Sequence, residues 1–179
     1  IDAAVATAFV LSVTLPQAGN LGGGGFLVFW HAPERKSYAL NFREIAPQLA
    51  HRGLFLNADG TVSKNKEFFS LLSTGVPGSV AGLLKAQKRF GRLSRAEVMA
   101  PSIQLADAGF VVYPQLADSL KRAFSRLSQD PTARSLFYRQ VDAPEGGIQW
   151  TPYQPGEKLR QPDLAKSLKL ISLKGVSGF

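Results

Sequence analysis

Arg43 is the residue of this sequence whose type and position best suit the binding of an anionic ligand. It ends a stretch, residues 38–43, in which apolar and other side chains alternate as in a strand, and a loop with Pro47 follows. A guanidinium at such a position can hold a carboxylate through two parallel hydrogen bonds, each charge-assisted bond contributing about 1.5–3 kcal/mol. The residues alone leave a second interpretation open, and composition favours it: a structural salt bridge from Arg43 to Glu44 or another acid.

The four glycines of residues 22–25 suggest phosphate binding at first sight, but the sequence around them excludes the known phosphate motifs. A P-loop requires Lys and then Ser or Thr after the glycines, whereas Phe26 and Leu27 follow here. A dinucleotide fingerprint requires glycine at its sixth position and a preceding strand, and neither is present. We therefore expect a steric role, in which glycine permits close backbone approach at the start of a strand. Proximity to an active site is the alternative.

The remaining candidates do not form a complete catalytic set. The two histidines, His31 and His51, are too few and too far apart for a zinc site, and neither lies near a nucleophile elbow. The chain has no Cys, which removes disulfides, thiolate metal ligands and Cys nucleophiles. The sequence therefore predicts no catalytic residue, no metal site and no cofactor within this chain.

The net charge of +8 gives little information about partners. The densest basic groups, within residues 85–95 and 121–126, lie on stretches that resemble amphipathic helices, and we interpret them as solvated faces. No nucleic-acid motif accompanies them, so no nucleic-acid partner is expected. No apolar run approaches the roughly 18 residues that span a membrane, and no signal peptide is visible. The chain starts at Ile1 without Met, and we expect both ends to be cut from a longer polypeptide.

The first third of the sequence predicts a helix followed by a hairpin. Residues 3–14 are small and apolar on nearly all sides, which indicates a buried helix that Pro16 ends. The fully apolar residues 26–30 predict a strand covered on both faces. A short connection joins it to the alternating residues 38–43, so the two strands should form an antiparallel hairpin. Residues 44–77 should be irregular, with a turn at 57–60 and an exposed stretch at 63–67.

From residue 78 onward the sequence predicts a series of helices. We expect Ser79 to cap the first and Gly91 to end it, and Ser94 with Glu97 to form a capping box on the second. Pro101 should kink or split that second helix before Gly109 closes it. Further helices should begin at Pro114, Pro131 and Pro162, with a loop at residues 140–161. We expect one structural unit over residues 1–179, of the α+β class, mostly helical with a β-hairpin.

Several segments, in this order along the chain, resemble motifs of the γ-glutamyltransferase (γ-glutamyltranspeptidase) family. The segments are Asp2-Ala3-Ala4-Val5-Ala6, Pro16-Gln17 with Leu21-Gly22-Gly23-Gly24-Gly25-Phe26, Asn41-Phe42-Arg43-Glu44-Ile45-Ala46-Pro47, Thr74-Gly75-Val76-Pro77-Gly78-Ser79-Val80-Ala81-Gly82, Phe90-Gly91, Ala106-Asp107-Ala108-Gly109-Phe110 and Gln161-Pro162-Asp163-Leu164-Ala165. One departure is Asn41, where many members have Asp. The resemblance covers essentially the whole chain and places it in the first part of the family's large subunit.

The resemblance implies a function that this chain would carry only in part. Family members are precursors that cleave themselves, and the new N-terminal Thr of the small subunit attacks a γ-glutamyl carbonyl to form an acyl-enzyme. Glutathione-like donors and a small subunit of the same precursor are therefore the expected partners. Arg43 matches the family arginine that binds the donor α-carboxylate. The implied fold of the parent is the αββα sandwich of N-terminal nucleophile hydrolases, and bacterial members are commonly exported to the periplasm or secreted.

Two other hypotheses remain open on the sequence. The parent protein could be a related acylase or a poly-γ-glutamate depolymerase with the same fold and the same Thr chemistry. A non-catalytic basic interaction module would instead show salt-sensitive binding to nucleic acid or anionic lipid.

Overall fold

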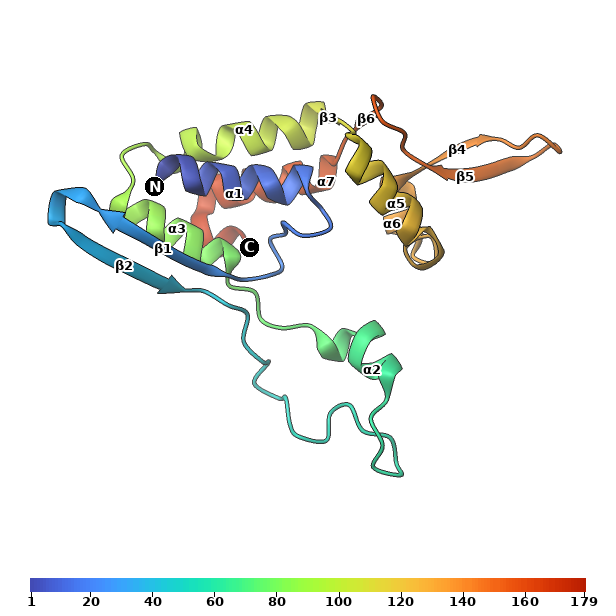
Figure 1. Cartoon of the computed structure of the whole chain (residues 1–179), viewed down its shortest axis with the longest axis horizontal. Coiled ribbons are helices and arrows are strands. Elements are labelled where there is room, and N and C mark those ends of the chain that lie inside the picture. The colour runs from blue at the N-terminus through green and yellow to red at the C-terminus, as the bar shows by residue number, and fades with distance from the viewer.

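Four helices form the packed centre of the molecule. The computed structural model describes the backbone of residues 1–179 and every side chain except that of Phe69. The central helices are α1 (Asp2–Thr14), α3 (Ser79–Phe90), α4 (Arg95–Ala108) and α7 (Pro162–Lys174). Helix α4 packs against both α1 and α7 (Figure 1). The facing side chains form the core, in which Phe9, Met99 and Leu168 are fully buried.

The ends of these helices follow the local sequence signals with two exceptions. Ser94 and Glu97 form the predicted capping box of α4, and Gly109, with φ 87°, follows its last residue. The predicted cap at Ser79 is wrong, because the N-cap of α3 is Gly78 and Ser79 is already helical. The predicted split at Pro101 is also wrong, since α4 continues through it to Ala108. Packing against helices on two sides keeps α4 intact despite the N–H that proline lacks.

Helix α1 ends at Thr14, two residues before Pro16, as predicted. Its burial, however, is one-sided. Phe9 and its neighbours on one face lie in the core, whereas Leu11 on the other face is 40% exposed. The expectation of a helix buried on nearly all sides is therefore wrong for the described chain.

The predicted antiparallel hairpin is confirmed. Strand β1 (Phe26–His31) pairs with β2 (Lys36–Asn41), and the register runs from Phe26 opposite Asn41 to His31 opposite Lys36. The 3-10 turn η1 (Ala32–Glu34) connects the strands, and Arg35 after it adopts the left-handed conformation.

The two faces of β1 differ. On one face Phe29 lies in edge contact with Phe90 of α3, at 4.9 Å between ring centroids. On the other face Phe26, Val28 and Trp30 are 65%, 73% and 61% exposed. The prediction of a strand covered on both faces is wrong for this chain, because the outer face carries three large apolar side chains in contact with solvent.

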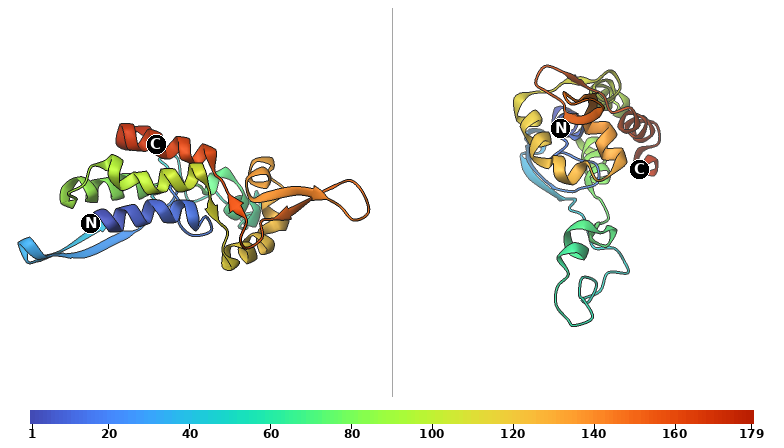
Figure 2. Two further views of the ribbon diagram at one scale, coloured as in Figure 1. Left: turned by 90° about the horizontal axis from the view of Figure 1, so that it is seen from above. Right: turned by 90° about the vertical axis from the view of Figure 1, so that its right-hand side faces the viewer.

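Residues 42–78, here called the connection, leave the end of β2 and return to the start of α3. Figure 1 and the right-hand view of Figure 2 show this segment extending away from the helices. The predicted turn is present, with the Gly60 N–H donating to the Asn57 carbonyl at 3.1 Å. The stretch expected to be an exposed loop instead begins helix α2 (Lys64–Phe69), capped by Ser63, and the 3-10 helix η2 (Leu71–Ser73) follows.

The segment between α4 and α7 makes a second extension. It contains α5 (Pro114–Leu127), α6 (Pro131–Phe137) and the antiparallel pair β4 (Tyr138–Asp142) and β5 (Ile148–Pro152). The short strands β3 (Phe110–Val111) and β6 (Lys158–Leu159) pair at its base, and η3 (Gly175–Gly178) follows α7. The predicted helices at Pro114 and Pro131 are confirmed, whereas the predicted loop at 140–161 is wrong.

The described backbone therefore mixes helices with three two-stranded sheets, as expected for the α+β class. No described helix is long and apolar enough to cross a membrane.

Candidate ligand-binding site at Arg43

Arg43 lies where the chain changes its pairing partner. Just before it, Phe42 extends the hairpin, donating its N–H to the Gly25 carbonyl at 2.9 Å and accepting from the Gly25 N–H at 3.4 Å. Just after it, Ile45 exchanges two hydrogen bonds with Val76, at 3.2 and 2.8 Å. Arg43 and Glu44 are the two residues between these pairings, so both flanks of the arginine are fixed by backbone hydrogen bonds.

Glycines from two other segments surround this short stretch of backbone. A Cβ on Gly24 would lie 2.4 Å from the Glu44 nitrogen and 2.6 Å from the Arg43 Cα. A Cβ on Gly78 would lie 2.0 Å from the Phe42 carbonyl oxygen. Any larger residue at either position would push the backbone at Arg43 away. The steric role expected for the glycine run is therefore confirmed at Gly24, and Arg43 is the residue beside it.

The same glycine segment anchors the start of helix α3. The Gly23 carbonyl accepts hydrogen bonds from the Gly78 N–H at 2.9 Å and from the Ser79 N–H at 3.0 Å. These are orphan donors of the first helical turn, which need partners outside the helix. Three segments that are distant in the sequence, at residues 22–25, 42–45 and 75–79, are thereby joined into one unit around Arg43.

The Arg43 guanidinium reaches out of this unit with weak partners. Its side chain is 60% exposed and its Nη2 lies 3.8 Å from Glu44 Oε1. Its Cζ lies 6.0 Å from the centre of the exposed Phe26 ring. The salt bridge to Glu44 expected from composition is present, but an exposed pair at this separation contributes little. The guanidinium therefore keeps donors available for a ligand carboxylate.

Glu44 is held more closely than its partner. A Cβ on Gly24 would lie 2.5 Å from Glu44 Oε2, and a Cβ on Gly75 would lie 3.2 Å from the Glu44 Cβ. The acidic side chain therefore fits between two glycines, where a bulkier neighbour would displace it. Reasoning from the sequence identified Arg43 and named Glu44 as its salt-bridge partner in the alternative interpretation, but it gave no role to Phe26 or the Asn41 side chain. The hairpin register, with residue 26 opposite residue 41, is the signal that could have found Phe26.

A hollow lies on the inner side of the glycine segment, between α1 and α3. Leu11, Leu21, Phe42 and Leu83 are among the residues that line it. Its lining residues include no charged side chain, so the hollow is a mainly apolar neighbour of the site.

The two histidines lie apart from each other and from Arg43, as ordinary loop and strand-end residues. His31 Nδ1 lies 3.1 Å from Glu34 Oε1 at the tip of the hairpin, and His51 Nδ1 accepts the Gly53 N–H at 3.2 Å. Among the side chains that the structure describes, no cluster of three His, Asp or Glu residues could hold a metal ion.

Several carboxyl groups outside the site have lowered pKa values, and two of them, Asp2 and Glu34, connect neighbouring segments of the chain. The Arg92 N–H donates to Asp2 Oδ2 at 2.7 Å and, with the Leu93 N–H, lowers the pKa of Asp2 despite partial desolvation. The Tyr38 hydroxyl donates to Glu34 and lowers the pKa of that carboxyl group. Asp2 thus links the start of α1 to the segment after α3, and the second pair stabilises the hairpin tip.

Comparison with known proteins shows the family. The γ-glutamyltranspeptidase family model matches residues 1–179. The chain is 40% identical, over its whole length, to a glutathione hydrolase proenzyme of Pseudomonas sp. and 38% identical to that of Escherichia coli, and it covers 30% and 29% of those proteins. The structure of Helicobacter pylori γ-glutamyltranspeptidase aligns with a TM-score of 0.90 at 36% identity, covering 99% of this chain and 48% of that one. The chain therefore belongs to the γ-glutamyltranspeptidase family and spans about a third of the length of these curated relatives.

Proposed function

We propose that the whole protein containing this chain is a γ-glutamyl hydrolase or transferase acting on glutathione-like donors, and that Arg43 binds the donor α-carboxylate. One observation carries the role of Arg43. Three separate segments fix the backbone on either side of it through glycine contacts and hydrogen bonds, while its guanidinium stays 60% exposed. A backbone held in place, with a guanidinium whose N–H donors remain available, is the arrangement that suits bidentate binding of a carboxylate.

The chemistry proposed for the whole protein needs a nucleophile from the small-subunit part of the precursor. The hydroxyl of its N-terminal Thr attacks the γ-carbonyl, and the free α-amino group of that Thr takes the proton. The bond from the γ-carbon to the donor amine breaks, the amine leaves with a proton, and an ester-linked acyl-enzyme remains. Water then releases glutamate, or the amine of an amino acid takes the γ-glutamyl group. Arg43 contributes by orienting the donor.

The small-subunit part of the same precursor is also the proposed structural partner. The outer face of β1 and the connection expose large apolar side chains, among them Leu49 at 89% and Leu71 at 92%. Large apolar side chains exposed in this number favour a surface that another part of the protein covers. We propose that residues 1–179 are one partial domain, that the missing part covers these faces, and that the completed fold is the αββα sandwich. The relatives from Pseudomonas sp. and E. coli are named glutathione hydrolase proenzymes, which supports processing of a precursor.

If the protein is bacterial, we propose that it is exported to the periplasm or secreted, on the basis of family membership. The sequence of the chain itself adds no targeting signal to this proposal.

A related acylase, or a poly-γ-glutamate depolymerase, is the second candidate. The structure of a cephalosporin acylase from Bacillus halodurans aligns with a TM-score of 0.72 at 27% identity over 96% of this chain. That likeness is weaker than the likeness to the H. pylori enzyme, and the acylase keeps the same fold. A basic interaction module without catalysis is the third candidate, supported only by the net charge of +8.

A donor panel separates these candidates. Purified full-length protein would be given two chromogenic anilides, one γ-glutamyl and one glutaryl. Both acyl groups end in a carboxylate, and they differ only in the α-amino group, which glutaryl lacks. We expect chromophore release from the γ-glutamyl anilide alone. Release from the glutaryl anilide alone, with autocleavage intact, would identify an acylase. Release from neither, with salt-sensitive binding to nucleic acid or anionic vesicles, would favour the interaction module.

A further inference from the structure

We infer that Asn41 is a positioning residue for Arg43, and that its uncharged side-chain oxygen fixes the arginine backbone without adding a charge to the site. This inference rests on the proposed function, because it assigns a role within the same carboxylate-binding site.

The geometry places Asn41 at the point where the strand ends and the site begins. Asn41 is the last residue of β2 and lies opposite Phe26, the first residue of β1. One residue further on, Phe42 still pairs with Gly25. The Arg43 N–H then turns to Asn41 Oδ1 at 3.0 Å. A side-chain oxygen that accepts from the N–H two residues later forms an Asx turn, which sets the backbone direction of the residues it encloses.

This hydrogen bond matters because the contacts of the Arg43 guanidinium itself are loose. The guanidinium is 3.8 Å from Glu44 Oε1 and 6.0 Å from the centre of the Phe26 ring, and its side chain is 60% exposed. Neither contact is short enough to fix where the guanidinium points. The direction of the side chain therefore depends on the backbone at residue 43, and Asn41 is the side chain that bonds to that backbone.

The uncharged amide also suits the electrostatics of the site. Glu44 already places one carboxylate beside the guanidinium, and a second would compete with the carboxylate of the ligand. An Asp at position 41 would keep the acceptor and add this charge. The hydrogen bond and the charge can therefore be separated by two substitutions at the same position.

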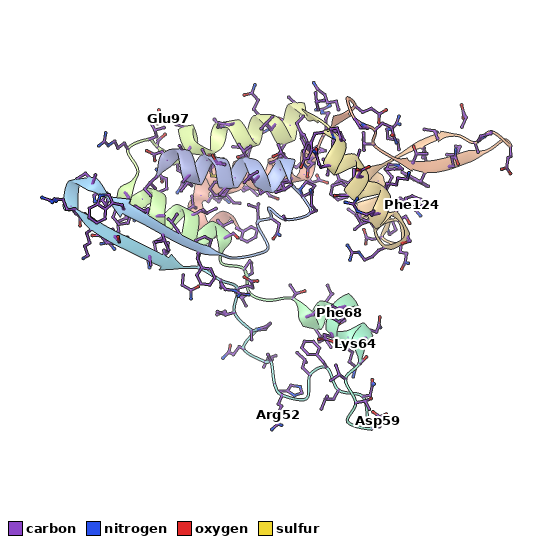
Figure 3. All side chains as sticks on the ribbon, in the orientation of Figure 1. Arg52, Asp59, Lys64, Phe68, Glu97 and Phe124 are labelled. Atoms are coloured by element: carbon purple, nitrogen blue, oxygen red, sulfur yellow. The ribbon has the colours of Figure 1, made fainter. Side chains whose placement is uncertain are left out.

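The experiment compares Asn41→Ala, Asn41→Asp and a matched control in the full-length protein. Asp59→Ala removes an equivalent turn, since Asp59 Oδ1 accepts the Thr61 N–H at 3.0 Å, and Asp59 lies at the far end of the connection (Figure 3). The readouts are kcat and KM with the γ-glutamyl anilide at low and high salt, and autocleavage on a gel. For Asn41→Ala, we expect KM to rise about three- to tenfold at all salt concentrations, with kcat within about twofold, as for one lost hydrogen bond.

Asn41→Asp should rescue most of this loss. We expect its KM to lie within about threefold of the unsubstituted protein at low salt and to approach it at high salt, because salt screens an exposed charge. Asp59→Ala should leave KM unchanged. In the Arg43→Ala background, Asn41→Ala should add less than about 1.5-fold, since coupled residues are not additive.

The inference is overturned if Asn41→Ala has a normal KM while Arg43→Ala is impaired, or if the effect of Asn41→Ala is just as large without Arg43. Equal losses from Asn41→Ala and Asp59→Ala would also overturn it, because they would show a general cost of losing a turn. If the unsubstituted, autocleaved protein releases no chromophore from the γ-glutamyl anilide, the proposed function itself fails, and this inference fails with it.

Discussion

The helical bundle differs from the hairpin and the connection in how far its large apolar side chains are exposed to solvent. In the bundle, Phe9, Met99 and Leu168 are fully buried among their neighbours. In the hairpin and connection, Trp30 is 61% and Leu71 is 92% exposed. The bundle buries its large apolar side chains within its own core, whereas the hairpin and the connection leave several of theirs in contact with solvent.

Arg43 lies at the boundary between these regions. Its backbone is tied to the start of α3 through the Gly23 and Gly78 contacts, and α3 belongs to the bundle. Its guanidinium and the exposed Phe26 beside it face outward with the hairpin. This chain therefore holds the backbone at Arg43 in place from the bundle side, while the guanidinium points away from the bundle. Under the proposed function, the part that closes over the ligand is supplied by the small-subunit part of the precursor.

The largest effect is expected from a substitution that leaves a cavity in the core of the helical bundle. Leu168→Ala in the full-length protein should lower the free energy of unfolding by about 2–5 kcal/mol, because a fully buried leucine leaves a void when truncated. Urea unfolding measures this change. A loss below about 1 kcal/mol would show that the neighbouring side chains move into the cavity left by Leu168, and that the bundle is not the rigid part of the molecule.

The matched change in the connection is Leu71→Ala. If the small-subunit part covers Leu71, this substitution should cost about 1.5–3 kcal/mol in the full-length protein, which is the usual value for burying a leucine side chain. The same urea unfolding measures it. A change within about 0.5 kcal/mol, as for an ordinary surface residue, would mean that Leu71 stays in solvent and that the small-subunit part does not cover it.

A smaller effect is expected at the capping box of α4. Ser94→Ala removes the acceptor for the Glu97 N–H, at 3.2 Å, and should lower stability by about 1 kcal/mol. Ser125→Ala, on the exposed side of α5, is the control and should change stability by less than about 0.5 kcal/mol. Equal effects of the two substitutions would show that the cap contributes nothing.

The smallest effect is a pH dependence at Asp2. Its pKa is lowered in the folded chain by the Arg92 N–H, so its contribution to stability is complete above the unfolded-state value near 3.8. That contribution is lost as pH falls through the lower, folded-state pKa. The difference in urea midpoint between the unsubstituted protein and Asp2→Asn should therefore be largest at neutral pH and shrink below pH 4. A difference that grows on acidification would contradict the role of this carboxylate.

Local signals in the sequence predicted most of the helices. The capping box at Ser94 and the prolines at the starts of α5, α6 and α7 use only the backbone near them, so they could be read directly. Motif order, and not physical chemistry alone, singled out Arg43. That Gly24 and Gly78 both approach the backbone of residues 42–44 could not be predicted from their spacing, because these contacts join segments far apart in the sequence.

The wrong predictions also have physical causes. The run Phe26–Trp30 was expected to be buried on both faces because all its side chains are apolar, but only the face toward α3 is packed within this chain. Residues 140–161 looked like a loop because their glycines and prolines suggested turns, whereas Gly146 and Gly147, with φ of 91° and 88°, form only the tip of the β4–β5 hairpin. Pro101 was expected to kink or split α4, but the helix is continuous from Arg95 to Ala108, packed between α1 and α7.

The central claim, that Arg43 binds the donor carboxylate, is tested most directly by Arg43→Ala in the full-length protein. Arg122→Ala, on the exposed face of α5, removes the same charge and serves as the control. We expect Arg43→Ala to raise KM for the γ-glutamyl anilide about ten- to a hundredfold, the loss expected for charge-assisted hydrogen bonds. Autocleavage should remain intact, and KM of the Arg122→Ala control should equal that of the unsubstituted protein. A KM for Arg43→Ala equal to that of the Arg122→Ala control would contradict it.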